Sequence, residues 1–278
     1  MREILGRRRR FRFRRKARTA RQDAAVTFAV EWNWPVLPGV GLEEPARTTK
    51  SSGSVAAGSA AAGGTAGRLG AGWFGAGRFG AGRFGGGPGF GVGERADGAD
   101  GDGPVCACLD PGCVVPGAHP FDPGLLAATT DERMIRWWWT RRPDAPIVLA
   151  TGGRAPCAVS LPAPAGTRAL QALDAAGMRL GPVVATPTRW SILVAPYGLE
   201  RLGELLYAKD SVPSSLRFHG EGGYLLLPPS TAGTGPVRWE RAPFAGSARP
   251  WLPDVEAVVD ALVEASTATP GGGSRLAY

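Results

Sequence analysis

The sequence predicts an α+β domain with a mixed or antiparallel sheet, interrupted by a long insertion rich in Gly and Ala. Strand-like runs alternate with single amphipathic helices, and this pattern favours α+β over a doubly wound sheet. Residues 42–104 are dominated by Ser, Ala and Gly. Three cysteines and a histidine gather just after that stretch.

Short apolar runs bounded by Pro, Gly or polar residues predict the strands. These runs cover 34–38, 146–151, 157–161, 181–186, 190–196, 215–219, 224–227 and 237–240. Apolar residues at helical spacing predict the helices. These helices cover 23–32, 128–143, 168–176, 199–208 and 254–265. The second of them should be capped by Thr130 or Asp131 and should end at Pro143.

The surplus positive charge is confined to the N-terminus. The chain has 32 Lys and Arg, 24 Asp and Glu, and a formal net charge of +8. Residues 1–21 hold eleven of these bases and one acid, Glu3, which leaves a net charge of −2 for the rest. We expect 1–21 to be a disordered basic arm that contacts nucleic-acid phosphates. The contacting bases would be Arg7, Arg8, Arg9, Arg10, Arg12, Arg14, Arg15 and Lys16. A solubilising leader is an equally good interpretation.

Composition sets the remaining boundaries. A unit GAGWF or GAGRF repeats within 70–84. Such a stretch buries too little apolar surface to offset its chain entropy, so 42–104 is predicted to be a disordered insertion. The folded domain should cover 22–41 and 105–266, with a flexible tail at 267–278.

No apolar run approaches the ~20 residues that span a bilayer, and no apolar segment follows the basic N-terminus, so we expect a cytoplasmic protein without a membrane partner.

A cluster of metal-ligand residues follows the insertion. Cys106, Cys108, Cys113 and His119 have the spacing C-x-C-x4-C-x5-H. Three thiolates and one imidazole complete the tetrahedral shell of zinc, and four protein ligands leave no open position, so the zinc would be structural. A loop with free thiols and a surface histidine is the alternative. Cys157 stands apart in an apolar strand and should be a small buried hydrophobe.

Several motifs, in order, resemble one family. They are Trp34-Pro-Val-Leu-Pro38, the cysteine run ending in GAHP (117–120), ATTD…IRWWW…LATG (128–152), GGYLLLPPS (222–230) and PWLP (250–253). Over 22–41 and 105–266 the chain resembles the Prim-Pol domain of bacterial bifunctional DNA primase/polymerases, part of the archaeo-eukaryotic primase superfamily. The cysteine loop is similar to that of actinobacterial members. The resemblance implies an RRM-like fold and an enzyme that makes primers and extends DNA.

The same resemblance shows where this chain departs from the family. Two-metal phosphoryl transfer needs carboxylates that hold two divalent ions ~4 Å apart. The family's two strand-end acids fall on Ser160 and Pro162, its nucleotide-binding His on Ser191, and its third acid on Arg217. Serine alone is a poor Mg²⁺ ligand and proline has no side-chain oxygen. The family's glycine after the acids is in register at Gly166.

We therefore expect a degenerate Prim-Pol protein, a pseudoenzyme that does not use Mg²⁺ or Mn²⁺. It would bind nucleic acid, with DNA as one possibility, or a replication or regulatory protein. One alternative is an active DNA primase/polymerase with displaced metal ligands, in which His219 or Glu221 is shifted into the site. The other is a protein-binding scaffold. The chain has no GxxxxGK[ST] motif, so any unwinding would come from a partner.

Overall fold

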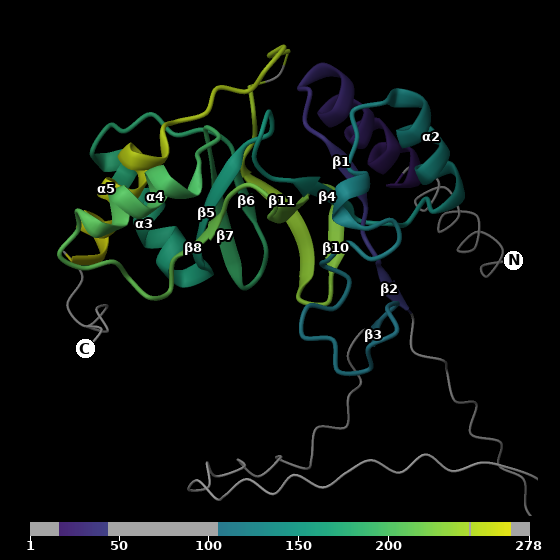
Figure 1. The fold of residues 1–278 in the computed structure, drawn as a ribbon, viewed down its shortest axis with the longest axis horizontal. Coiled ribbons are helices and arrows are strands. Elements are labelled where there is room, and N and C mark those ends of the chain that lie inside the picture. The colour runs from purple at the N-terminus through teal and green to yellow at the C-terminus, as the bar shows by residue number, and fades with distance from the viewer. Residues whose placement is uncertain (1–16, 44–104, 245, 268–278) are drawn as a thin grey trace, which may run out of the picture. The chain divides into compact units, whose positions relative to one another are not determined.

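The computed structural model describes residues 17–43, 105–244 and 246–267 (Figure 1). These residues belong to one compact unit, which covers 1–45 and 103–278. The predicted insertion, apart from 42 and 43, and the predicted tail, apart from 267, lie outside the described residues. Among the described helices, none is both long and apolar enough to cross a bilayer.

The first helix begins earlier than the sequence predicts. Residues 17–26 are α-helical and continue as a π-helical turn, η1 (Thr27–Glu31). Arg18 donates to the Asp144 carboxylate at 2.7 Å, and Arg21 donates to the carbonyls of Pro143 and Pro229. The prediction that the arm extends through residue 21 is therefore wrong at its end, because 17–21 form a helical turn that contacts the domain.

A small antiparallel sheet packs against this helix and the next one. Its strands, in spatial order, are β1 (Val36–Pro38), β4 (Ile147–Ala150) and β9 (Tyr224–Leu227). Helix α2 (Glu132–Arg141) starts as predicted, because the Asp131 side chain accepts a hydrogen bond from the backbone N–H of Met134 at 2.8 Å. Trp138 and Trp139 of α2 are buried in the same core, whereas Trp137 is half exposed.

A six-stranded sheet holds most of the remaining strands. In spatial order they are β10 (Ser230–Ala232), β11 (Gly235–Arg241), β6 (Val183–Ala185), β7 (Arg189–Val194), β5 (Cys157–Pro162) and β8 (Arg217–His219). All of its pairings are antiparallel. The sequence did not predict β10. Its first residue, Ser230, is buried and bonds the carbonyl of Leu227 and the N–H of Ile147, which ties the two sheets together.

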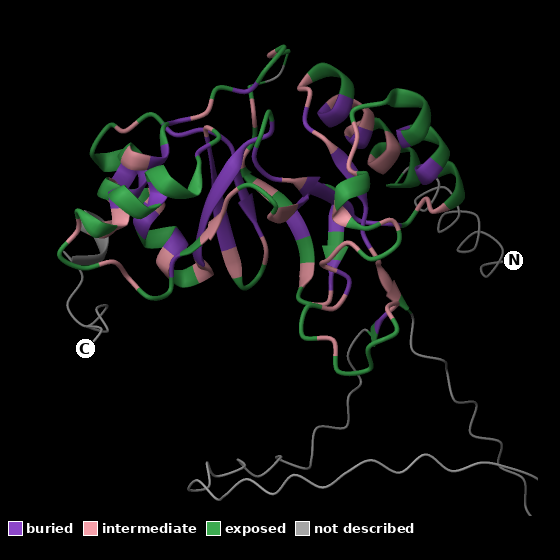
Figure 2. Cartoon of the chain, viewed as in Figure 1, coloured by how far each residue is buried: buried purple, intermediate pink, exposed green. Residues whose placement is uncertain are grey.

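Three helices cover one face of this sheet (Figure 1). They are α3 (Ala163–Ala175), α4 (Leu199–Tyr207) and α5 (Val255–Thr267). Their apolar side chains share a core with Cys157, Val159 and Leu161 of β5, so the prediction that Cys157 is buried is confirmed. Figure 2 shows exposed outer surfaces on these helices and buried strands beneath them. Successive strand residues alternate between faces, so Ser160 belongs to the opposite face.

A two-stranded pairing closes the end of the insertion. Strand β2 (Leu42–Glu43) pairs antiparallel with β3 (Val105–Cys106), and Leu42 lies opposite Cys106. The cysteine-containing loop follows and leads through a short helix, η2 (Leu125–Ala127), to α2. The pairing of β2 with β3 thus fixes the position of Cys106, the first cysteine of the cluster.

Candidate functional site

The three family positions on strands lie side by side on the sheet. Ser160 of β5 pairs with Ser191 of β7 on one side and with Arg217 of β8 on the other. The three residues are far apart in the sequence, and the strand pairing brings them together. Pro162 instead ends β5, where it precedes the first residue of α3.

A hydrogen-bond network centres on the Ser160 hydroxyl. Nη2 of Arg189 donates to this oxygen at 3.2 Å and to the Ser160 carbonyl at 2.9 Å. His219 Nε2 lies 3.0 Å from the same hydroxyl. Arg189 can only donate to the Ser160 hydroxyl, whereas the donor in the contact between Ser160 and His219 depends on the histidine tautomer.

His219 lies among groups that disfavour its charged form. Burial lowers the pKa of His219, and the charges of Arg189 and Arg217 lower it further, against a backbone hydrogen bond with Tyr224 that raises it. Burial also lowers the pKa of Arg189, with a second contribution from Arg217. A lowered pKa is expected for a partly buried basic group that has no anion nearby, and both His219 and Arg189 show it.

These side chains line a cavity of about 450 Å³. Ser160, Ser191, Arg217 and His219 face it together with Arg189, and the hydroxyls of Thr186 and Thr188 add to its polar side. Part of the wall comes from the cysteine loop, through Val114, Val115, Pro116 and Ala118. Within the described part of the chain, the residues that line the cavity include no Asp or Glu.

The residues around this cavity do not fit a divalent metal pair. Mg²⁺ requires carboxylate and other oxygen ligands, whereas the charged groups here are two guanidinium ions. Glu221 lies outside the lining, in the turn after β8, where its backbone packs against Gly152. His219 reaches the cavity but is bonded to Ser160. The residues predicted to be displaced metal ligands thus bring no acid into the cavity.

Gly166 allows helix α3 to pack closely against strand β7. A Cβ atom at this position of α3 would lie 2.9 Å from Cβ and Cγ of Trp190 on β7. The helix therefore approaches the sheet closely only because residue 166 has no side chain. Gly166 therefore has a packing role between α3 and β7.

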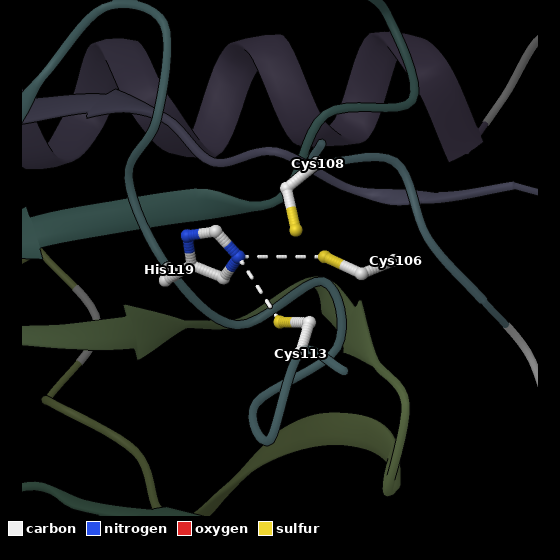
Figure 3. Close-up of side chains that lie close together, drawn as sticks. All are labelled: Cys106, Cys108, Cys113 and His119. Atoms are coloured by element: carbon white, nitrogen blue, oxygen red, sulfur yellow. Dashed lines mark hydrogen bonds between the residues drawn. The ribbon is translucent and has the colours of Figure 1, made fainter. Parts of the chain in front are cut away.

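The second site is the cysteine–histidine cluster. One ligand atom from each of Cys106, Cys108, Cys113 and His119 lies within 4.8 Å of all the others. Figure 3 shows the sulfur atoms gathered around the imidazole, whose Nε2 lies 3.4 Å from both Cys106 Sγ and Cys113 Sγ. Zn–N and Zn–S bonds at a tetrahedral ion place such neighbouring ligand atoms about 3.5 Å apart. The cluster can hold a metal ion, and its composition is compatible with zinc.

The surroundings of the cluster suit metal binding. His119 Nδ1 lies 3.0 Å from the Pro120 carbonyl, an interaction that orients the ring and directs Nε2 to the cysteines. Burial opposes ionisation of Cys106, but hydrogen bonds from Gly117 and Cys108 outweigh it and lower the pKa of this thiol to about 7. The Gly117 N–H donates to Cys106 Sγ at 3.2 Å. A metal ion would thus find one thiol that is easily deprotonated.

The predicted nucleic-acid contacts of the arm, from Arg7 to Lys16, lie outside the described residues. Sequence reasoning also missed Arg189, although a signal was present. Residues two apart on a strand share a face, so Arg189 must face the same side of β7 as Ser191.

Comparison with protein families assigns this chain to one family. A family model described as bifunctional DNA primase/polymerase, N-terminal (Prim-Pol), matches residues 25–255. The match covers most of the chain, and the protein belongs to the Prim-Pol family. Searches of the curated proteins and of the solved structures give no match.

Proposed function

We propose that this protein is a non-catalytic Prim-Pol member that binds nucleic acid, or a replication or regulatory partner, through the retained fold. One observation carries the proposal. Ser160, Ser191 and Arg217 form a single row on the sheet, at the cavity where the family resemblance places catalytic groups.

The electrostatics of the row argue against two-metal catalysis. Carboxylates in such a site attract both ions and clamp the attacking and leaving oxygens. Here Arg217 replaces one acid and Arg189 lies beside it, so a divalent cation would meet like charge. Ser160, the remaining oxygen donor at the centre, already bonds Arg189 and His219.

Primer synthesis and primer extension test this proposal. The full chain, supplied with template, nucleotides and Mg²⁺ or Mn²⁺, should form no product above background, because the site lacks the carboxylates that hold the ions. A catalytically competent Prim-Pol protein in the same assay serves as the control. Product that forms with this chain and disappears in Glu221→Ala or His219→Ala would show that displaced ligands support catalysis.

The proposal includes an RRM-like central fold. The succession β5–α3–β6–β7–α4–β8 is β-α-β-β-α-β, as in ferredoxin-like folds. These four strands lie in the order β6-β7-β5-β8, and the two helices pack on the same face. The topology supports the RRM-like assignment and leaves the other face for the cavity.

We also propose that the arm supplies most of the affinity for nucleic acid. Residues 1–16 contain nine Arg and Lys and one acid. Contacts between such bases and phosphates release counterions, with a log–log salt slope of about −0.9 for each phosphate neutralised on B-DNA. Arg18 and Arg21 are occupied by domain contacts and belong to the folded part.

Deletion of residues 1–16 should therefore remove most DNA binding and flatten its salt dependence. If about five arginines engage phosphates, the full chain should lose two to three orders of magnitude in affinity between about 50 and 200 mM salt. Fluorescence anisotropy with labelled duplex DNA measures both effects. A deletion to residue 21 is unsuitable because it also removes Arg18 and Arg21. Equal affinity and an equal slope in the Δ1–16 variant would assign the binding to the domain instead.

The metal of the cysteine–histidine cluster is, we propose, a structural zinc ion. Three cysteines and one histidine make a donor set typical of closed zinc sites. The cluster joins the β2–β3 pairing to the loop that lines the cavity, so the ion would stabilise that wall.

A further inference from the structure

The strongest unexplained feature is a pair of arginines without an acid. Nη2 and Nε of Arg189 bond only neutral oxygens, those of Ser160 and Ser215. Arg217 lies on β8, which β5 separates from the strand of Arg189, and its side chain forms no hydrogen bond or ion pair with any described residue. Neither arginine has a carboxylate within salt-bridge distance in the described ranges, whereas Arg18, Arg136 and Arg241 each do.

The two arginines face one cavity that has no carboxylate in its lining. Like charges repel, and although solvent screens the exposed Arg217, its charge lowers the pKa of the partly buried Arg189 in addition to the larger effect of burial. Arg189 is held in place by three protein oxygens, which leaves the N–H groups of its Nη1 without a partner among the described residues. An anion that binds both guanidinium groups would use these donors and offset the repulsion, since the planar fork of Arg matches the geometry of phosphate.

The cavity has room for more than an inorganic ion. A volume of about 450 Å³ lies within the range of small-molecule sites, about 300–1,000 Å³. Thr186 and Thr188 also line the cavity, and because the Thr186 hydroxyl donates to the Arg189 carbonyl, the Thr188 hydroxyl is left as the further donor. The other side is apolar and includes Val184 and Leu226. A ligand with an anionic head and an apolar or aromatic body fits both sides.

We propose that this cavity binds a phosphate monoester directly on Arg189 and Arg217, without a divalent metal. Where the family would place carboxylates that bind cations, this cavity has arginines that bind anions. The inference concerns the cavity alone. It depends neither on the arm nor on the absence of polymerase activity.

Isothermal titration of the full chain with a deoxynucleoside monophosphate tests the proposal. The buffer should contain no added Mg²⁺ or Mn²⁺, and also no chelator, which would remove zinc from the cysteine cluster. We expect saturable binding that added Mg²⁺ does not strengthen. The corresponding nucleoside, which lacks the phosphate, should bind at least about tenfold more weakly, because it loses charge-assisted hydrogen bonds.

The matched variants are Arg217→Gln and Arg154→Gln. Arg217 is exposed and its side chain makes no hydrogen bond or ion pair with the described residues, so its variant should fold normally while binding the monophosphate at least about tenfold more weakly. Arg154 is an exposed arginine outside the cavity lining, and its variant should bind normally. Thermal unfolding of both variants confirms that the fold is kept.

A further pair of probes separates a free monoester from the end of a strand. They are oligonucleotides of one sequence with a 5′-phosphate or a 5′-hydroxyl. A preference for the 5′-phosphate that Arg217→Gln abolishes would identify strand ends as ligands, and equal binding of the two would identify the free monoester. No saturable binding of either kind of monoester, binding that Arg217→Gln leaves unchanged, or binding that requires Mg²⁺ would overturn the proposal. A failure here leaves the primer assay unaffected, so the two proposals are tested separately.

Discussion

Protein purified under reducing conditions, without chelators, should contain about one zinc ion per chain, and a Cys106→Ser/Cys108→Ser variant should contain none. The four ligand atoms already converge, and removing two of them leaves too few donors for a tetrahedral ion. Because the binding free energy of a structural metal adds to the folding free energy, the variant should also unfold at a lower temperature. Elemental analysis and thermal unfolding measure the two effects.

Cys157→Ala is the matched control for this experiment. Cys157 is fully buried on β5 and shares the core of the helix-covered face, away from the cluster. Its variant should keep the full zinc content. Wild-type protein without bound metal, or a double variant that retains it, would contradict the assignment.

Trp139→Ala should destabilise the domain by about 3–5 kcal/mol, which is the usual cost of truncating a buried aromatic side chain. Trp139 is 1% exposed, and its indole N–H donates to the Ala145 carbonyl at 3.1 Å. The change would empty the space between α2 and β1 and leave that carbonyl without its partner. Chemical denaturation measures the free energy of unfolding.

Trp137→Ala provides the contrast. Trp137 is 50% exposed, and its ring contacts mainly the guanidinium of Arg141, at 4.6 Å. An exposed cation–π contact contributes about 0.5–1 kcal/mol, so this variant should lose no more than that. Similar losses for the two variants would show that α2 does not bury the face described here.

The local elements were predictable because local signals determine them. Asp131 caps α2 and Pro143 follows its end, as the sequence indicated. The late start predicted for α3 and the failure to predict β10 have identifiable reasons. Pro164 lies in the first turn of α3, where proline is tolerated, so the helix starts before the predicted Arg168. Ser230 follows two prolines but begins β10, because pairing with β11 overrides the local turn signal.

The site was predictable only in part. The cysteine–histidine cluster lies within a short stretch of sequence, and its spacing alone indicated a metal site. The row of Ser160, Ser191 and Arg217 depends on the register of three strands, which no local pattern determines. The resemblance located these residues, but it could not show Arg189 beside them or the absence of acids from the cavity lining among the described residues.

The pairing of β2 with β3 has a consequence for the length of the segment between them. Leu42 and Cys106 are direct neighbours across this pairing, so the segment that begins at residue 44 leaves and re-enters the domain at one point. If that segment is an unstructured loop, as its composition predicts, each doubling of its length raises the closure free energy by only about 0.6 kcal/mol. The GAGRF repeats could therefore expand or contract in number between related chains at little thermodynamic cost, while both ends stay anchored next to Cys106.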